Sequence, residues 1–276
     1  MIELIIKKNE RIAAMTRILC SHPNQNYTLN YFSELFHSGK STISEDIAII
    51  RDTLLAFHLG DLITTAGAAG GVRFVPLMEK KDSATYITGL CHELSESNRI
   101  LAGGYLYMND ILHDPHQVIQ IGEILATRFM DNQPDFVFTV ETKGTPIALA
   151  VAYFLGCPVV VAGRDGQAVA GPLVSINYVT ASSRRIQTMS ISKRAIKEGS
   201  RALIIDDFMK GGGTARGMAQ LLKEFNVDIV GTGVVIATKE PTEKLVEDYN
   251  SLMVLEGINE VENRIEISTA DWILAK

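Results

Sequence analysis

The residues best suited to chemistry lie between Ala202 and Thr214, in the stretch ALIIDDFMKGGGT. The apolar run Leu203–Ile205 is typical of a buried parallel strand, so we expect Asp206 and Asp207 to emerge at its carboxyl end. In open α/β sheets ligands bind at that edge, where strand ends meet the starts of the following helices. The two carboxylates are therefore candidates for ligand binding.

The residues that follow predict an anion site. Three successive glycines let backbone N–H groups approach a phosphate closely, and the Thr214 hydroxyl and the positive end of the next helix add to the attraction. The carboxylates would repel a phosphate, so they are better suited to ribose hydroxyls or to a hydrated Mg²⁺. Sugar hydroxyls and a 5′-phosphate together indicate a phosphorylated ribose. The three glycines are Gly211, Gly212 and Gly213.

This order of residues resembles the binding motif for 5-phosphoribosyl 1-diphosphate (PRPP) in the type I phosphoribosyltransferases. Lys210 departs from that motif, because the enzymes usually carry a small residue there. Its charge and bulk argue against turnover more than against binding. The alternative interpretation is an acidic strand end followed by a helix-capping threonine.

A second turn of the same kind follows a predicted strand that ends at Val140. It reads Glu141-Thr142-Lys143-Gly144-Thr145-Pro146 and opens a helix. The turn resembles the pyrophosphate loop of phosphoribosyltransferases, in which the backbone N–H groups and Lys143 would face the diphosphate. A capped helix with a surface lysine is the alternative. Two phosphate-type turns together carry more weight than either turn alone.

Further basic residues lie near these turns. Arg164 is the one basic residue after the strand Val159–Val161, where purine phosphoribosyltransferases tend to carry an Arg-Lys pair and a further lysine. This difference again favours binding with impaired chemistry. The stretch from Ser175 to Arg194 corresponds to the hairpin that covers PRPP in those enzymes, although solvated surface charges would also explain its basic residues. These are Arg184, Arg185, Lys193 and Arg194.

Composition limits the classes that the chain can belong to. A length of 276 residues with 46% hydrophobic and 21% charged residues indicates one large or two ordinary globular domains. The net charge of −6 requires that any nucleic-acid contact come from a local patch. Cys20, Cys91 and Cys157 have no metal or redox spacing, and no stretch is long enough to span a membrane. We expect a soluble cytoplasmic protein with no membrane partner.

The first part of the chain has the pattern of a winged helix. Apolar spacing predicts helices at Arg11–Cys20 and Leu29–His37, and Ser41 opens a longer helix with N-cap and capping-box candidates. Two helices joined by a glycine turn suggest helix-turn-helix. Strands at Leu62–Thr65 and Val72–Val75, joined by a glycine-rich tip, predict the hairpin that forms the wing.

We therefore expect a DNA-binding domain over residues 1–76, with the helix at Ser41 as its recognition helix. This segment contains seven Lys or Arg and seven Asp or Glu residues, so its charge alone does not support DNA binding. A small helical dimerisation or regulatory module is the alternative. The candidates for DNA contact are Lys40, Ser41, Thr42, Ser44, Arg51 and Arg73.

Residues 77–276 form the second expected domain, after a charged connection from Pro76 to Asp82. A helix is expected at Ser83–Ser97 and a strand at Gly103–Tyr107. Strands and helices then alternate, which predicts a mostly parallel sheet with helices on both faces. The strands are Phe136–Val140, Pro158–Ala162, the run at Leu203 and Val227–Ala237, and the helices are Pro115–Met130, Gly144–Leu155 and Thr214–Phe225.

A winged helix fused to a phosphoribosyltransferase-like domain resembles the PurR purine-operon regulators of Gram-positive bacteria over nearly the whole chain. The most specific stretches are Thr42–Ile50, Gly67–Val72, Gly103–Tyr107, Ser175–Val179, Arg185–Ser190 and Leu203–Lys210. The resemblance implies a homodimeric transcription factor that binds promoter DNA of purine genes. It also implies that PRPP, accompanied by Mg²⁺, is sensed without catalytic turnover.

The same resemblance assigns roles to residues around the ligand. Tyr105 and Phe208 would lie where a purine base or its substitute sits, and Asp206, Asp207 and Lys210 would contact PRPP. The second interpretation is a working purine phosphoribosyltransferase of the adenine or xanthine type with an added N-terminal domain. The lysine in the glycine loop and the single basic residue at Arg164 argue against it.

Overall fold

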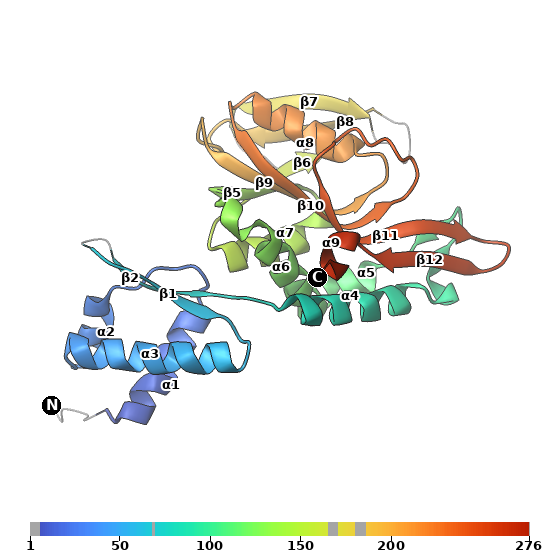
Figure 1. Ribbon diagram of the computed structural model, residues 1–276. Helices are drawn as coiled ribbons and strands as arrows, with labels where there is room; N and C mark the ends of the chain where they lie inside the picture. The colour runs from blue at the N-terminus through green and yellow to red at the C-terminus, as the bar shows by residue number, and fades with distance from the viewer. Residues whose placement is uncertain (1–5, 68–69, 165–170, 180–185, 276) are drawn as a thin grey trace. The chain divides into compact units, whose positions relative to one another are not determined.

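The computed structural model describes residues 6–67, 70–164, 171–179 and 186–275. The chain divides into two compact units (Figure 1). The N-terminal unit comprises residues 1–79 with residues 153–156, and the C-terminal unit comprises residues 80–152 and 157–276. Among the described residues, no helix is both long and apolar enough to cross a membrane.

The N-terminal unit contains the predicted helix-turn-helix and wing. Its apolar core includes Met15, Phe32, Ile43 and Val72, so every element contributes to one cluster. The strands of the wing are antiparallel, with Asp61 opposite Val75. The elements are α1 (Lys8–Cys20), α2 (Leu29–Leu35), α3 (Lys40–Ala56), β1 (Asp61–Thr65) and β2 (Gly71–Val75).

The helices of this unit differ from the sequence prediction at their ends, and α1 begins at Lys8, three residues before the predicted Arg11. Helix α3 begins at Lys40, and its N-cap is the extended Gly39, which has no side chain to cap with. The predicted N-cap at Ser41 is therefore wrong, because that residue is already inside the helix. Helix α2 ends at Leu35 and not at His37, whose φ of 49° lies in the left-handed region and cannot continue a right-handed helix.

The C-terminal unit is built on an eight-stranded sheet with the order β12-β11-β10-β9-β5-β6-β8-β7 in the described residues. Strands β11, β10, β9, β5 and β6 are parallel, while β12 at one edge and β8 and β7 at the other run antiparallel to their neighbours. The strands are β5 (Phe136–Val140), β6 (Val159–Arg164), β7 (Leu173–Val179), β8 (Ile186–Ser192), β9 (Arg201–Met209), β10 (Asp228–Thr238), β11 (Asn250–Asn259) and β12 (Arg264–Thr269).

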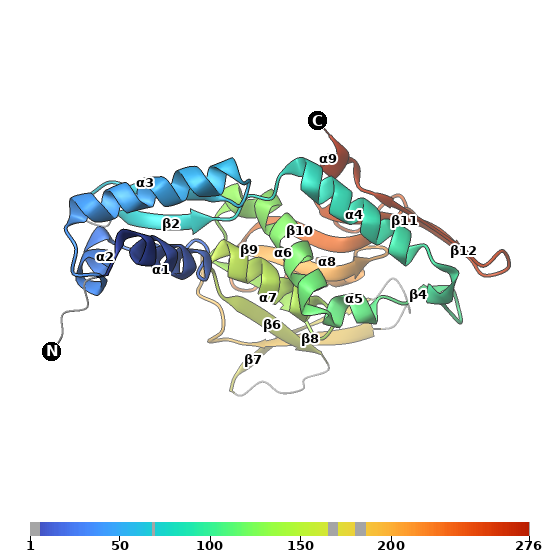
Figure 2. The ribbon, with the colours of Figure 1, turned by 90° about the horizontal axis from the view of Figure 1, so that it is seen from below.

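Helices cover both faces of the centre of this sheet (Figures 1 and 2). Helices α6 (Pro115–Phe129) and α7 (Gly144–Leu155) lie on one face and α8 (Gly213–Lys223) on the other. Every residue of β5 is buried, as expected for a strand covered on both sides. The α6 face is close-packed, because a Cβ at Gly231 or Gly233 of β10 would come within 2.8 Å of the Phe129 ring.

The chain paths through the sheet create a switch point between β5 and β9. The β5-α7-β6 connection and the β9-α8-β10 connection move in opposite directions across the sheet. Because such crossovers are right-handed, their helices fall on opposite faces. The pairing of β5 with β9 ends at Phe138 and Ile204, whereas β9 continues along β10 to Met209. Open α/β sheets bind ligands at such points.

The hydroxyl- and arginine-rich stretch forms the β7–β8 hairpin. Its strands interrupt the α/β alternation, because β7 and β8 follow β6 without a helix and pair antiparallel at the edge of the main sheet beside β6. Helix α8 packs on it so closely that a Cβ at Gly217 would lie 3.0 Å from the Tyr178 side chain. Lys193 and Arg194 follow β8 and are exposed, while Arg184 and Arg185 lie outside the described residues.

The remaining elements surround the sheet. Helix α4 begins at Lys80 and ends at Leu94, three residues earlier at both ends than predicted, because Lys80-Lys81-Asp82 forms its first turn and is not part of the connection. The strand expected at Gly103–Tyr107 is reduced to a two-residue strand. These elements are α4 (Lys80–Leu94), η1 (Ser97–Arg99), β3 (Ile100–Leu101), β4 (Tyr105–Leu106), α5 (Asn109–His113), η2 (Met130–Asn132) and α9 (Asp271–Leu274).

Candidate functional site

The paired carboxylates lie within β9 and not beyond it. The strand runs to Met209, because pairing with β10 continues past Asp206, which is opposite Val234. Asp206 is 5% exposed, and its Oδ1 accepts a hydrogen bond of 3.0 Å from the backbone N–H of Asp207. Burial, and then the charge of Asp207, raise the pKa of the Asp206 carboxyl well above its ordinary value. A nearby cation would therefore favour its ionised form.

The turn after β5 lies directly against this carboxylate. Gly144 is the first residue of α7, and a Cβ there would be 3.0 Å from Asp206 Oδ1 and 2.6 Å from Thr139 Oγ1. Only glycine allows α7 to start so close to the carboxylate. The buried Thr139 hydroxyl has no hydrogen-bond partner among the described residues. The turn after β5 thus lies against the Asp206 carboxylate, and the glycine loop follows the carboxyl end of the neighbouring parallel strand β9.

Arg164 joins the same edge at the end of β6. Its backbone N–H donates to Glu141 Oε2 at 3.4 Å, and its positive charge opposes the rise in the pKa of Asp206. The buried Nε of Arg164 has no partner in the described part of the chain. Thr142 and Lys143, next in the turn, are exposed. Arg164 is thus close enough to the Asp206 carboxylate for their charges to interact at this edge of the sheet.

The glycine loop leads into α8. Gly211, Gly212 and Gly213 are buried, and α8 begins at Gly213, one residue earlier than predicted. Gly212 is the N-cap, with a φ of 77° that disfavours any side chain, and it provides no side-chain cap. Thr214 is half-buried in the first turn, and Lys210 is exposed at the start of the loop. The helix start therefore has backbone N–H groups without a side-chain cap.

Phe208 and Tyr105 occupy different surroundings. Phe208 is half-buried in β9, opposite Ile236. Tyr105 is 58% exposed on the short β3–β4 hairpin. Within the described residues, no hydrogen bond joins Tyr105 to Asp206 or to the glycine loop.

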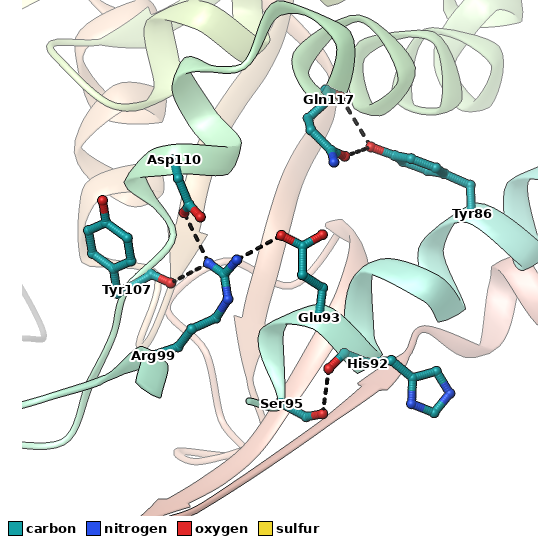
Figure 3. A network of polar contacts seen from close by, with 8 residues as sticks. All are labelled: Tyr86, His92, Glu93, Ser95, Arg99, Tyr107, Asp110 and Gln117. Atoms are coloured by element: carbon teal, nitrogen blue, oxygen red, sulfur yellow. Dashed lines mark hydrogen bonds and ion pairs between the residues drawn. The ribbon is translucent and has the colours of Figure 1, made fainter. Parts of the chain in front are cut away.

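A buried arginine fixes the base of the Tyr105 hairpin (Figure 3). Arg99 is 8% exposed and donates to Glu93 Oε1 of α4 at 2.7 Å and to Asp110 Oδ1 of α5 at 3.0 Å. It also donates to the carbonyl oxygen of Tyr107 at 3.3 Å. One guanidinium thus ties the hairpin to the helices on either side of it.

Sequence reasoning missed some residues that support the site. Lys244 donates from Nζ to the carbonyl oxygens of Lys210 at 2.6 Å and Thr238 at 2.7 Å. These bonds tie the start of the glycine loop to the end of β10. A single lysine in a charged connection has no pattern that predicts this role. Thr139 did have a signal, because it is the one hydroxyl in the apolar strand FVFTV.

The DNA-contact candidates fall into two groups. Lys40, Ser41 and Ser44 are exposed together at the amino end of α3, and Thr42 beside them is half-buried. Arg51 instead donates to Asp61 from Nε at 2.7 Å and from Nη2 at 3.3 Å. Arg73 donates to Asn24 Oδ1 at 2.6 Å. These two arginines have partners inside the unit.

Helix α3 is anchored by a buried ion pair. Arg11 of α1 donates from Nε to Asp46 Oδ2 of α3, and Asp46 is 1% exposed. Its other oxygen, Oδ1, has no partner among the described residues. The pair adds to the buried side of α3, which also carries Ile43 and Ile47, while Ser41 and Ser44 are exposed.

Comparison with known proteins agrees with both units. Residues 7–76 match the N-terminal domain of the bacterial purine repressor, and residues 108–266 match the phosphoribosyl transferase domain. The purine biosynthesis transcriptional repressor PurR of Bacillus subtilis (strain 168) is 43% identical over 267 residues, which cover 97% of this chain and 94% of that protein. The chain belongs to the PurR family.

Other relatives extend this result. The purine biosynthesis transcriptional activator PurR of Lactococcus lactis subsp. lactis (strain IL1403) is 38% identical over 95% of this chain and 97% of that protein. Adenine phosphoribosyltransferase from Thermoanaerobacter pseudethanolicus has a TM-score of 0.52 at 20% identity and covers 60% of this chain and 98% of that structure. The last comparison shows the fold alone. The predicted family and fold class are confirmed.

Proposed function

We propose that this chain is a DNA-binding transcriptional regulator of purine biosynthesis genes that acts as a homodimer in the cytoplasm and senses PRPP. The observation that carries the proposal is the contact of Gly144 with Asp206. That contact brings a diphosphate-type turn and a ribose-phosphate motif to one edge of the sheet, in a chain of the PurR family. The N-terminal unit would bind promoter DNA, and the C-terminal unit would bind PRPP.

Each part of PRPP has a matching set of groups in this proposal. The 5′-phosphate binds the N–H groups of Gly211, Gly212 and Gly213 and the Thr214 hydroxyl at the start of α8. The ribose hydroxyls donate to Asp206 and Asp207. The diphosphate lies at the turn after β5. Its partners would be Thr142, Lys143 and Gly144, with Arg164 beside them.

The donor set also fits Mg²⁺. This ion is usually held by one or two carboxylates together with substrate phosphates. Asp206 and Asp207 are adjacent. Burial and the charge of Asp207 disfavour ionisation of Asp206, and a bound cation would stabilise its ionised form. When bound, Mg²⁺ would neutralise charge on the diphosphate.

We further propose that PRPP is sensed without base transfer. Lys210 stands at the start of the glycine loop, and Arg164 is the single basic side chain after the apolar part of β6. Both differences from the enzymes leave binding groups in place and change the surroundings of the reacting centre. Tyr105 and Phe208 would lie on the side of the ligand where the enzymes hold a base.

DNA recognition would centre on the amino end of α3. Lys40, Ser41, Thr42 and Ser44 would meet base edges and phosphates there, as recognition helices do. Arg51 and Arg73 would contact phosphates only with the N–H groups not used by Asp61 and Asn24.

The experiment is binding of labelled promoter DNA from a purine gene, with and without PRPP and Mg²⁺, and transcription from the same promoter. PRPP is expected to change DNA affinity or transcription for the wild type but not for Asp207→Ala. Asp228→Ala, an exposed residue at the opposite end of the parallel strands, should respond like the wild type. A protein that ignores the DNA and releases diphosphate from PRPP with a purine base would overturn the proposal in favour of an enzyme.

A further inference from the structure

The connection between β10 and β11, residues 239–249, is bonded to the backbone of the glycine loop. The carbonyl oxygen of Lys210 accepts from Lys244 Nζ at 2.6 Å. The Thr238 hydroxyl lies 3.1 Å from the same oxygen and 2.6 Å from the carbonyl oxygen of Glu240, which is the closer acceptor for its single proton. The next carbonyl oxygen, that of Gly211, accepts from the backbone N–H of Leu245 at 3.0 Å. Two successive carbonyl groups of the loop therefore point toward this connection.

Because of peptide geometry, these bonds also determine the direction in which the N–H groups of the loop point. In a trans peptide the C=O and the following N–H point in opposite directions, and the cis bonds in the described chain lie elsewhere, at Glu141-Thr142 and Glu240-Pro241. The N–H groups of Gly211 and Gly212 therefore point away from the connection. Successive N–H groups directed to one side form an anion-binding concavity.

All three N–H donors of the Lys244 ammonium have acceptors within the protein. An ammonium has three N–H donors, and three acceptors lie within 3.3 Å of Nζ: the carbonyl oxygens of Lys210 and Thr238 and the Thr238 hydroxyl. Lys244 is therefore not a free cation for the phosphate. Lys239 in the same connection differs, because its exposed side chain pairs with Glu256 at 2.6 Å.

We infer that Lys244 is a positioning residue for the 5′-phosphate of PRPP, an inference that rests on the function proposed above. Its ammonium holds the Lys210 carbonyl away from the phosphate and so directs the Gly211 N–H toward it. Without Lys244, that peptide is free to rotate, and a carbonyl oxygen facing the phosphate would repel it. The β10–β11 connection thus sets the shape of a site to which it contributes no ligand.

The test uses the full-length protein and two fragments of PRPP. Ribose 5-phosphate probes the glycine loop, and inorganic diphosphate probes the turn after β5. In calorimetric titrations, Lys244→Met should raise the dissociation constant of ribose 5-phosphate by about tenfold or more, the size expected for loss of one charge-assisted hydrogen bond. Diphosphate affinity should stay within about twofold, since its turn keeps its contacts. Lys244→Arg should recover part of the loss, and the control Lys239→Met should bind both fragments like the wild type.

Three results would contradict the inference. They are unchanged ribose 5-phosphate binding in Lys244→Met, an equal loss of both fragments, and the same selective loss in Lys239→Met. Should Lys244→Met fail to fold, Thr238→Val removes the hydroxyl that accepts from Lys244 Nζ at 3.3 Å while keeping the side-chain volume, and it should show a smaller loss of the same selectivity. A wild type that binds neither PRPP nor ribose 5-phosphate would overturn the proposed function itself, which separates the two failures.

Discussion

A single methyl group at Gly144 should disturb the turn after β5 and the buried Asp206 carboxylate. In Gly144→Ala the Cβ would lie 2.6 Å from Thr139 Oγ1 and 3.0 Å from Asp206 Oδ1, so the start of α7 or the carboxylate must move. Overpacking of this kind costs about 1–3 kcal/mol. We expect lower stability in urea unfolding and weaker PRPP binding in titration.

A second glycine provides the control for this substitution. Gly89 lies in α4, where an added Cβ meets no atom within 4 Å. Gly89→Ala should leave PRPP binding unchanged and stabilise the protein by about 0.5–1 kcal/mol, because alanine favours the helix. Tight PRPP binding by Gly144→Ala would show that the contact with Asp206 is not part of the site.

Asp206 should make the protein less stable as pH rises. Its pKa in the folded protein is raised above the ordinary value of 3.8, first by burial and then by Asp207. Below pH 3.8 the group is protonated in both states and contributes no difference. Between that value and the raised pKa the unfolded state releases its proton first, so the free energy of unfolding falls.

The variant Asp206→Asn isolates this effect, because its amide does not titrate. Its free energy of unfolding, measured in urea over a pH series, should lack the decline, so the variant gains stability relative to the wild type as pH rises. It should bind PRPP more weakly, since the carboxylate is lost. Parallel pH profiles of the two proteins would contradict the prediction.

Much of the site at this scale is predictable from residue type, and the remainder depends on contacts distant in sequence. Paired carboxylates before three glycines indicate a ribose phosphate because few other patterns combine those groups. Lys244 has no such signal, because its partner Lys210 is 34 residues away and offers only a carbonyl oxygen. A backbone acceptor leaves no mark in the sequence.

At the scale of elements, Arg99 should hold the β3–β4 hairpin that carries Tyr105 in a fixed conformation. Arg99→Met removes its bonds to Glu93, Asp110 and the Tyr107 carbonyl. We expect a loss of about 1–3 kcal/mol, because the two carboxylates are partly exposed and can be rehydrated. Amide hydrogen exchange in the hairpin should rise.

The control is Arg264→Met, which removes an exposed ion pair with Glu266 on β12 and should cost at most about 1 kcal/mol. Exchange in the hairpin should be the same in this variant and in the wild type. If Arg99→Met also leaves that exchange unchanged, the guanidinium does not hold the hairpin in place.

The buried pair between α1 and α3 should decide whether α3 is held in position. Arg11→Met leaves Asp46 buried without its cation, a change that costs about 3–5 kcal/mol. DNA affinity should fall with the folded fraction of the unit. In urea unfolding, Arg11→Met/Asp46→Leu should recover most of the stability, because an apolar pair needs no compensation. Arg17→Met, on the exposed side of α1, is the neutral control, and a comparable loss there would argue against the pair.

The elements themselves were predictable to different degrees for physical reasons. Strand β5 and helices α6 and α7 agree with the sequence prediction within one residue, because they combine strong apolar patterns with clear ends such as Pro115. The placement of β7 and β8 was not predictable, because it depends on pairing between β8 and β6, which are separated in sequence. No element is predicted after Ala237, where β11 pairs in parallel with β10 and antiparallel with β12.

At the scale of the whole molecule, the charge balance limits how DNA can be bound. The net charge of the chain is −6, and in the N-terminal unit Arg11 and Arg51 are neutralised by Asp46 and Asp61. Few cations therefore remain to contact phosphates from one unit. The proposed homodimer would double that number across two half-sites, so dimerisation would matter for affinity as well as for specificity.

Coupling between PRPP and DNA must be reciprocal if PRPP regulates by changing DNA affinity. If PRPP changes the DNA dissociation constant by some factor, promoter DNA changes the PRPP dissociation constant by the same factor, typically about 5–150-fold for couplings of about 1–3 kcal/mol. DNA is titrated by fluorescence anisotropy with and without PRPP, and PRPP is titrated by calorimetry with and without saturating DNA.

Both titrations must use the same salt concentration, because DNA affinity depends steeply on salt. Both factors should be one in Asp207→Ala. Unequal factors in the wild type would contradict two-site coupling. If neither ligand changes the other's dissociation constant but PRPP still changes transcription, PRPP acts after the DNA is bound.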